Sequence, residues 1–324
     1  MIPTAWIDLA ERRLEGQIEQ TPLTYDPELD LYVKWENRQT TGSFKIRGAF
    51  NKVLSLESWE RQRGLVTASA GNHGQGVALA AGKIGAPVTV FASAQAVPAK
   101  IAAMRAYGAE VRLVEGGYAA AENAGKAYAA AAGAVWISPY NDGQIVAGQA
   151  TLGTEILRQL SPVVPAAVIV PVGGGGLIAG IGAVLSHTAP RPRLVGVQSD
   201  ASPFFHALYH HGTQAGAVEL DSLADGLAGA VEEGSITIPM VRKYVDALEL
   251  VTEEQIAAAI AFAWRKYNEK IEGSAAVALA YAIKNAPSRP DGPWVVVVSG
   301  GNIQPEIHAQ ICADNGEPAK NTML

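Results

Sequence analysis

The sequence predicts an α/β protein in which parallel sheets are flanked by helices, and two observations support that prediction. Short apolar runs rich in Val, Ile and Leu alternate along the chain with longer alanine-rich stretches. Strand and helix repeated in this order are typical of parallel sheets with helices on both faces. Several alanine-rich stretches also end in glycine, as at Gly85, Gly108 and Gly133, which is typical of a helix C-terminus.

The predicted strands are apolar runs that begin or end at polar residues, glycine or proline. They are LYVKWE (31–36), GLVTAS (64–69), PVTVFAS (87–93), EVRLVE (110–115), AVIVPV (167–172), RLVGVQS (193–199) and WVVVVSG (294–300). The predicted helices are rich in Ala, Gln, Glu and Lys, which have high helix propensity. They are GNHGQGVALAAGKIG (71–85), AVPAKIAAMRAYG (96–108), YAAAENAGKAYAAAAG (118–133), GQIVAGQATLGTEILRQL (143–160) and EEQIAAAIAFAWRKYNEK (253–270).

Composition and charge exclude several classes of protein. The 324 residues are 48% hydrophobic and 17% charged, which is enough apolar material for one large core or two smaller ones. Net charge is −6 without a basic block, so we expect no nucleic-acid partner. The only cysteine, Cys312, rules out an intrachain disulfide and a cysteine-based zinc site.

Two segments bear on the cellular location. The N-terminus MIPTAWIDLAERRLEG lacks the basic start, apolar core and cleavage site of a secretory signal, so we expect a cytoplasmic protein. Residues 166–185 are uncharged and long enough to cross a bilayer. They contain Pro171 and six glycines, however, so a strand, a tight turn and a buried helix explain them better than a membrane span.

Three glycine-rich turns follow predicted strands. They are TASAGNHGQG (67–76), VPVGGGGLIAG (170–180) and VVVVSGGN (295–302). In parallel sheets, binding residues gather at the carboxyl ends of the strands, in the turns that open the next helix. We therefore expect all three turns to lie on one edge of one sheet.

The run Gly173–Gly176 leaves two interpretations open. Glycines between a strand and a helix let backbone N–H groups approach an anion, and the ligand expected there is a phosphate. The run lacks the Lys-Ser/Thr of a nucleoside-triphosphate loop. Gly174, Gly176 and Ala179 do satisfy the dinucleotide pattern, with Asp200 at the distance of a ribose ligand, which would indicate a nicotinamide or flavin enzyme.

Four motifs taken together resemble one family. TGSFKIRGA, SAGNHGQGVA, VPVGGGGLIAG and VSGGN occur in the order and spacing of the fold-type II, tryptophan-synthase-β-like enzymes that use pyridoxal phosphate. The likeness is to the branch of threonine/serine dehydratases and serine racemase, and it extends from Gln20 to Asn302. It implies a homodimer of two-domain subunits. Residues 1–58 and 142–324 would form a large cofactor domain, and residues 59–141 a small mobile substrate domain.

The resemblance assigns cofactor roles residue by residue. Lys45 would form an imine with the cofactor aldehyde and act as the catalytic base, and Phe44 would pack on the pyridine ring. Asn72 would bind the ring hydroxyl, Ser299 the ring nitrogen, and Glu272 would lie near the cofactor. Gly173, Gly174, Gly175 and Gly176 would hold the phosphate through backbone N–H groups, which removes the ribose role from Asp200.

The resemblance also assigns the substrate site. Ser69, Ala70, Gly71, Asn72 and His73 would form the loop that binds the substrate carboxylate at a helix N-terminus. Tyr140 would lie near the substrate β-substituent. We expect His73 to order this loop and not to exchange protons during catalysis.

The reaction predicted by the resemblance is α,β-elimination from a β-hydroxy amino acid such as L-threonine or L-serine, giving a 2-oxo acid and ammonia. A serine, unlike an aspartate, leaves the ring nitrogen a weaker electron sink, which at Ser299 suits elimination. The racemase branch has a second base where this chain has Ala70, so racemisation is the less favoured alternative. A dehydratase for a bulkier β-hydroxy amino acid is another alternative. A cofactor-binding protein without catalysis is a third.

Two further expectations concern metal and regulation. Racemase-type relatives bind a divalent cation where this chain has Gln198, Ser202 and Phe204, a poor ligand set, so we expect no metal. His206 and His210 are four residues apart but have no evident third ligand. The short stretch after VSGGN leaves no room for a regulatory domain, which favours a compact catabolic-type enzyme.

Overall fold

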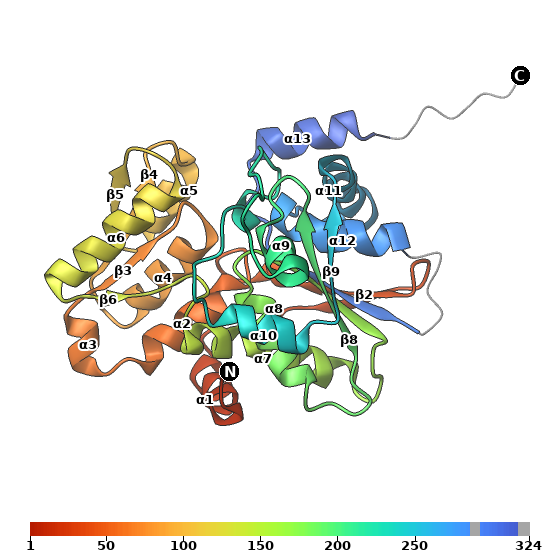
Figure 1. Cartoon of the computed structure of the whole chain (residues 1–324), viewed down its shortest axis with the longest axis horizontal. Helices are drawn as coiled ribbons and strands as arrows, with labels where there is room; N and C mark the ends of the chain where they lie inside the picture. Colours follow the sequence, from red (N-terminus) through yellow and green to blue (C-terminus); the bar gives the residue numbers. More distant parts are fainter. Residues whose placement is uncertain (286–291, 317–324) are drawn as a thin grey trace, which may run out of the picture.

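The computed structural model describes residues 1–285 and 292–316 and contains two sheets (Figure 1). The larger sheet has six strands in the order β1-β2-β10-β7-β8-β9. These strands are β1 (Leu23–Asp26), β2 (Leu31–Trp35), β7 (Ala167–Pro171), β8 (Arg193–Ser199), β9 (Ala247–Val251) and β10 (Trp294–Val298). All neighbouring strands in it are parallel except the β1–β2 hairpin.

The smaller sheet has four parallel strands in the order β5-β4-β3-β6. They are β3 (Leu65–Ala68), β4 (Val88–Ser93), β5 (Glu110–Val114) and β6 (Val135–Trp136), and all of them fall between residues 59 and 141. This sheet and its helices occupy one side of the molecule in Figure 1. The α/β fold with parallel sheets is confirmed, whereas the domain boundaries stay a prediction.

The described helices cover both sheets. They are α1 (Thr4–Leu14), α2 (Lys45–Ser55), α3 (Ser58–Gln62), α4 (Asn72–Lys83), α5 (Pro98–Ala106), α6 (Tyr118–Ala132), α7 (Gly143–Leu160), α8 (Gly176–Leu185), α9 (Phe204–His211), α10 (Thr237–Tyr244), α11 (Glu253–Tyr267), α12 (Gly273–Asn285) and α13 (Pro305–Asp314). Two 3-10 turns, η1 (Glu36–Arg38) and η2 (Asp225–Leu227), interrupt the loops. Gly133 closes α6 in the left-handed conformation, and Gly85 and Gly108 also have positive φ angles just after α4 and α5.

Alternating side chains of the central strand build two separate apolar cores. Val295 and Val297 of β10 pack in the core that α7 and α8 cover. Val296 and Val298 of the same strand pack on the opposite face, under α11 and α12. A strand buried on both faces is a continuous apolar run, which explains why WVVVV carries no polar alternation.

The expectation that the three glycine-rich turns share one sheet edge is wrong. The turns after β7 and β10 belong to the six-stranded sheet, but the turn after β3 belongs to the four-stranded sheet. The chain divides its parallel strands between two sheets, and Asn302 after β10 bonds to Asn72 after β3. The predicted site therefore draws residues from both sheets and not from one.

Residues 166–185 form β7, a tight glycine turn and the buried helix α8, as predicted. Among the residues described by the structure, we find no helix with both the length and the apolar character needed to span a bilayer.

Candidate active site

Lys45 is the first residue of α2, and its amine points toward the segment that precedes α7. Its Nζ donates to the carbonyl of Pro139 at 3.2 Å and lies 5.2 Å from the centre of the Phe44 ring. Although the side chain is partly exposed, protein surrounds the amine, and this desolvation lowers the pKa of Lys45 to about 8. The Glu272 carboxylate opposes that shift. An amine of this kind is neutral, and hence nucleophilic, in a far larger fraction than a surface lysine.

The end of β10 pairs with the segment just before Lys45. The Phe44 N–H donates to the Ser299 carbonyl at 3.0 Å, and Ser43 forms an isolated bridge with Gly300. Ser299 is buried at the carboxyl end of the strand. The backbone register thus holds Ser299 beside Phe44 and Lys45, although more than 250 residues separate them in sequence.

The tetraglycine run forms the turn between β7 and α8. A Cβ on Gly174 would lie 2.3 Å from the Tyr140 ring, and one on Gly175 would lie 2.6 Å from Phe205. Gly175 also has φ +82°, a conformation that favours glycine. The turn therefore passes through a gap that admits only glycine, and it places the free N–H groups of the first turn of α8 at its end.

Tyr140 connects the glycine turn to the Lys45 side of the site. It follows Pro139, whose carbonyl accepts the Lys45 hydrogen bond, and its ring packs on Gly174. Its hydroxyl accepts a 2.9 Å hydrogen bond from the Glu232 N–H. The structure thus places Tyr140 as a wall of the glycine turn, and its contact with a substrate stays a prediction.

The third turn opens helix α4 and carries the predicted carboxylate loop. Ser69 is buried at the end of β3, Ala70 is exposed, and the Gly71 N–H donates to Ser69 Oγ at 3.1 Å. Asn72 and His73 begin the helix, where N–H groups have no acceptor within the helix. Two of the predicted carboxylate donors, Ser69 and Gly71, are thus bonded to each other in this state.

His73 is buried behind this turn. Its Nε2 lies 3.2 Å from the carbonyl of Ile137, a distance at which the neutral ring donates a hydrogen bond. Burial, and then the charge of Lys45, lower the pKa of His73 to about 3. A ring that stays neutral and bonded to the backbone is suited to ordering the loop.

Asn72 bonds to two side chains, those of Glu272, which precedes α12, and Asn302, which follows β10. Its Nδ2 donates to Glu272 Oε1 at 2.7 Å, and its Oδ1 accepts from Asn302 Nδ2 at 2.6 Å. Asn302 Nδ2 also donates to the Thr41 carbonyl at 2.8 Å. Burial, and then the Asp225 charge, raise the pKa of Glu272 to about 7.

The sequence alone indicates no role for Asn302, or for the hydroxyls of Thr41 and Ser43. Both hydroxyls are buried without a hydrogen-bond partner among the described residues. Asn302 ends the VSGGN motif, so its place in that motif was an available signal. Its partners come from residues 41 and 72, and sequence spacing does not show that contact.

The side chains at the positions where racemase-type relatives bind a cation form other contacts in this structure. Gln198 Oε1 accepts from the His206 N–H at 2.7 Å, and Ser202 Oγ accepts from the Gly229 N–H at 3.0 Å. His210 Nε2 lies 2.9 Å from the Leu248 carbonyl. Within residues 1–285 and 292–316, three or more His, Cys, Asp or Glu side chains nowhere form a metal-binding group.

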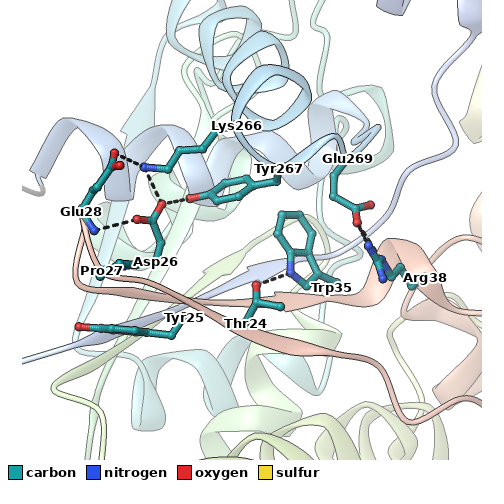
Figure 2. A pocket seen from close by; sticks show the side chains of 10 residues that line it. All are labelled: Thr24, Tyr25, Asp26, Pro27, Glu28, Trp35, Arg38, Lys266, Tyr267 and Glu269. Carbon is teal, nitrogen blue, oxygen red and sulfur yellow. Dashed lines mark hydrogen bonds and ion pairs between the residues drawn. The ribbon is translucent and has the colours of Figure 1, made fainter.

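A separate cavity of about 360 Å³ lies between the β1–β2 hairpin and the end of α11 (Figure 2). Its charged side chains pair with one another, because Lys266 bonds to Asp26 and Glu28, and Arg38 bonds to Glu269. None of the residues that line it belongs to the site around Lys45.

The arrangement around Lys45 combines three features that matter for its chemistry. They are an amine with a lowered pKa, a glycine turn that exposes N–H groups to an anion, and a second helix start that can bind a carboxylate. Phe44 and the Glu272 charge act on the amine directly, Asn72 bonds to Glu272, and the Ser299 carbonyl accepts from the Phe44 N–H. Such a site can hold a phosphorylated carbonyl compound and bring an amino acid to it.

Comparison with known proteins agrees with this chemistry. Residues 14–300 match the family described as pyridoxal-phosphate dependent enzyme. L-threonine ammonia-lyase of Thermotoga maritima is 40% identical over 309 residues, which cover 94% of this chain and 76% of that protein. The solved threonine deaminase isoform 2 of Solanum lycopersicum superimposes with a TM-score of 0.89 at 30% identity, covering 97% and 93% of the two chains. Maize serine racemase superimposes with a TM-score of 0.87 at 28% identity, covering 97% of each chain.

Proposed function

The chain belongs to the family of pyridoxal-phosphate-dependent enzymes, in the branch of threonine dehydratases and serine racemases, and on that premise we propose that it is an ammonia-lyase. Its substrate would be a β-hydroxy amino acid, with L-threonine or L-serine as the first choice. The net products would be a 2-oxo acid and ammonia. The observation that supports this most directly is the amine of Lys45, whose pKa is lowered to about 8 beside the glycine turn.

The residues present fit the cofactor. The glycine turn leaves no room for a Cβ at Gly174 or Gly175, yet it exposes the N-terminus of α8, as a phosphate cradle requires. Lys45 would hold the cofactor covalently through Nζ, and Ser299 would face its ring nitrogen. Asn72 would donate to its ring oxygen, and Phe44 would pack on its ring.

When bound, pyridoxal phosphate supplies a conjugated ring that accepts the electrons left on Cα after deprotonation. The protein must then move protons and hold the substrate. Lys45 Nζ, neutral once released from the cofactor, would take the Cα proton. The carboxylate would bind Ser69 and the N–H groups at the start of α4, which keeps the Cα–H bond directed at Lys45.

Elimination is favoured over racemisation by the side chain at position 70. Racemisation needs a proton donor on the face of Cα opposite Lys45, and the methyl group of Ala70 cannot donate one. His73 is the nearest other titratable residue of that loop, but it is buried, bonded to the Ile137 carbonyl and neutral above about pH 3. The carboxylate-binding loop therefore offers no second base opposite Lys45.

The dinucleotide interpretation of the glycine run does not hold. The family match assigns the chain to enzymes that use pyridoxal phosphate. Burial, followed by the charges of Glu253 and Glu254, raises the pKa of Asp200, the expected ribose ligand. On the proposed function, the glycine turn would bind the phosphate of pyridoxal phosphate.

The proposal is tested by following 2-oxo acid and ammonia release from L-threonine and L-serine. We expect stoichiometric formation of both products, and reduction with borohydride should fix the cofactor mass on Lys45 in a digest. Lys45→Ala should lose at least about a thousandfold in kcat. Lys83→Ala, which changes an exposed lysine at the end of α4, is the matched control. Product formation by Lys45→Ala at the wild-type rate would contradict the proposal.

We further propose that residues 59–141 move as a unit, and that the protein works as a cytoplasmic homodimer. The first point is supported by the placement of all four strands of the smaller sheet within that segment. The second rests on the resemblance, and the lone cysteine is compatible with a reducing compartment. Sedimentation equilibrium measures the oligomeric state, and a monomer at micromolar concentration would refute the dimer.

A further inference from the structure

Three hydrogen bonds in a row fix the orientation of the Asn72 side chain. The Thr41 carbonyl, which can only accept, binds Asn302 Nδ2 at 2.8 Å. The same nitrogen donates to Asn72 Oδ1 at 2.6 Å, so Asn72 must present its oxygen on that side. Its nitrogen then faces Glu272 Oε1 at 2.7 Å. The direction of the whole row is set by a backbone carbonyl and does not depend on the protonation state of Glu272.

This direction decides what Asn72 can offer to a ligand. Its oxygen is occupied by Asn302, whereas its nitrogen has two N–H bonds and gives only one to Glu272. The remaining N–H is a donor. A reversed amide would offer an oxygen in its place, which would repel an electron-rich ring oxygen.

We propose that Asn302 is a positioning residue that orients the Asn72 amide, so that Asn72 presents an N–H donor to the ring oxygen of the cofactor. This inference rests on the proposed role of Asn72 in cofactor binding. Asn302 does not itself need to touch the cofactor. It acts by occupying the Asn72 oxygen.

The backbone around Asn302 is built to hold that side chain in place. The Gly301 N–H donates to the Gly42 carbonyl at 2.9 Å, which joins the end of β10 to the segment before Lys45. A Cβ on Gly42 would lie 2.5 Å from Asn302 Oδ1, and Gly42 has φ +72°. The glycine thus gives the Asn302 amide the space in which it meets both Thr41 and Asn72.

The bond from Asn302 to Asn72 also joins the two sheets. Asn302 follows β10 of the six-stranded sheet, and Asn72 begins α4 after β3 of the four-stranded sheet. The orientation of the Asn72 amide therefore depends on the contact between the two sheets. Asn302 differs in this respect from residues that stabilise only one sheet.

The experiment compares Asn302→Asp with Asn302→Ala. The holoenzyme is stripped of cofactor and titrated with pyridoxal phosphate, with affinity and the absorption maximum of the bound cofactor as readouts. Alanine removes the donor, which should weaken binding about three- to tenfold. Aspartate puts an acceptor against the Asn72 oxygen and drives the amide to reverse, so binding should weaken at least about thirtyfold and the absorption maximum should shift.

Controls separate positioning from general damage. Asn315→Asp removes an amide that donates to the Ile311 carbonyl at the end of α13, outside the site, and should bind the cofactor as the wild type does. In Asn302→Asp combined with Glu272→Gln, a reversed Asn72 amide again has complementary partners on both sides. That double variant should recover part of the unfolding temperature lost in Asn302→Asp, since the Thr41 carbonyl still lacks its donor, without recovering cofactor affinity or the absorption maximum.

The possible outcomes are distinguishable. Equal losses of affinity in the Asp and Ala variants, or an unchanged absorption maximum in Asn302→Asp, would overturn the positioning role. Full recovery of affinity in the double variant would do the same, because it would show that Asn302 acts only through stability. If Asn72→Ala binds the cofactor like the wild type, the proposed role of Asn72 fails instead.

Discussion

Two titratable side chains of the site, Lys45 and Glu272, have pKa values shifted toward neutrality from opposite sides. Burial lowers the pKa of Lys45 to about 8 and raises the pKa of Glu272 to about 7, because a low-dielectric surrounding disfavours either charge. Glu272 still favours the charged lysine to some degree. A site with these two groups can release or accept a proton near physiological pH at low energetic cost.

The raised pKa of Glu272 predicts how stability changes with pH. Because the folded state binds this proton more tightly than the unfolded state, the contribution of Glu272 to the free energy of unfolding falls as pH rises from about 4.5 to about 7. This loss is up to about 3 kcal/mol. Buried His73, whose pKa is lowered, contributes in the opposite direction below about pH 6.5. Glu272→Gln keeps the acceptor for Asn72 and should remove the contribution of Glu272. The difference between wild type and variant in urea unfolding of the cofactor-free protein at pH 5 and pH 8 measures it.

Two neighbouring charges supply a check on this prediction. The Asp225 charge raises the pKa of Glu272 and the Lys100 charge lowers it. Asp225→Asn should therefore reduce the pH slope, and Lys100→Met should increase it. An identical slope in the wild type and in Glu272→Gln would show that Glu272 does not titrate in this range.

The sequence was sufficient to single out Lys45 but not Asn302. The motif TGSFKIRGA surrounds Lys45 with neighbours that a surface lysine does not need, so its local sequence carries the signal. Asn302 is important because of an amide that meets Thr41 and Asn72, which are 261 and 230 residues away in sequence. Such contacts are created by the folding of two sheets against each other.

In the turn that leads into α8, both side-chain packing and the proposed phosphate binding require glycine at position 174. Gly174→Ala would place a methyl group 2.3 Å from the Tyr140 ring, whose hydroxyl is tied to the Glu232 N–H. Relief requires the turn to shift, at a cost of about 1–3 kcal/mol. We expect cofactor affinity to fall about five- to hundredfold in a titration of the cofactor-free variant.

Gly117→Ala is the matched control for this change. Gly117 precedes α6, has an ordinary φ of −84°, and a Cβ there would meet nothing within 4 Å. It should leave cofactor affinity unchanged. Wild-type affinity in Gly174→Ala would mean that Tyr140 moves aside easily and does not shape the turn.

A buried ion network joins β2, η1, α2 and α7. Arg47 donates to Glu36 at 2.7 and 2.8 Å and to Glu155 at 2.9 Å, and Lys34 also pairs with Glu155. Arg47→Met would leave Glu36 and part of the Glu155 charge buried without compensation. We expect it to lower the free energy of unfolding by about 3–5 kcal/mol, measured in urea.

The exposed pair of Arg158 and Glu11 is the comparison for Arg47. Its atoms are 2.9 Å apart, but the Arg158 side chain is 63% exposed, so Arg158→Met should cost less than about 1 kcal/mol. Similar losses in the two variants would indicate that water reaches the network around Arg47.

Some elements were not recognisable from local sequence. β1 (LTYD) and β6 (VW) are too short for a pattern, and β9 (ALELV) lacks the apolar run of a strand buried on both faces. β1 and β9 lie at the two edges of the six-stranded sheet, where partial exposure permits polar residues. Pairing with neighbouring strands defines them, whereas the central strands have the apolar runs that the sequence shows directly.

At the scale of the whole described molecule, we also predict that enzyme activity does not depend on added metal. The atoms that would have to bind a cation after β8 are already bonded, Gln198 to the His206 N–H and Ser202 to the Gly229 N–H. We expect ammonia release to be unchanged after dialysis against EDTA, and unchanged again when magnesium is added. A severalfold stimulation by magnesium would show that this segment rearranges around a cation.

Two ion pairs connect the helices around the smaller sheet to the segment that precedes α10. Lys100 of α5 lies 3.4 Å from Asp225, and Lys126 of α6 lies 2.9 Å from Glu232. The second pair is the shorter, and Glu232 also accepts from Asn141 at 2.9 Å. If residues 59–141 close over the substrate, these pairs favour the closed arrangement.

Reversal of one ion pair tests this closure. Lys126→Glu places three carboxylates together, its own and those of Glu122 and Glu232, and should raise the KM for the amino acid about two- to fivefold at low salt. Adding Glu232→Lys restores opposite charges and should bring KM back toward the wild-type value. Because both side chains are about one-third exposed, the effect should shrink as salt approaches 1 M. A salt-independent change in KM, or one that the second substitution leaves untouched, would mean that Lys126 acts through the structure of α6 and not through a contact between the two halves of the molecule.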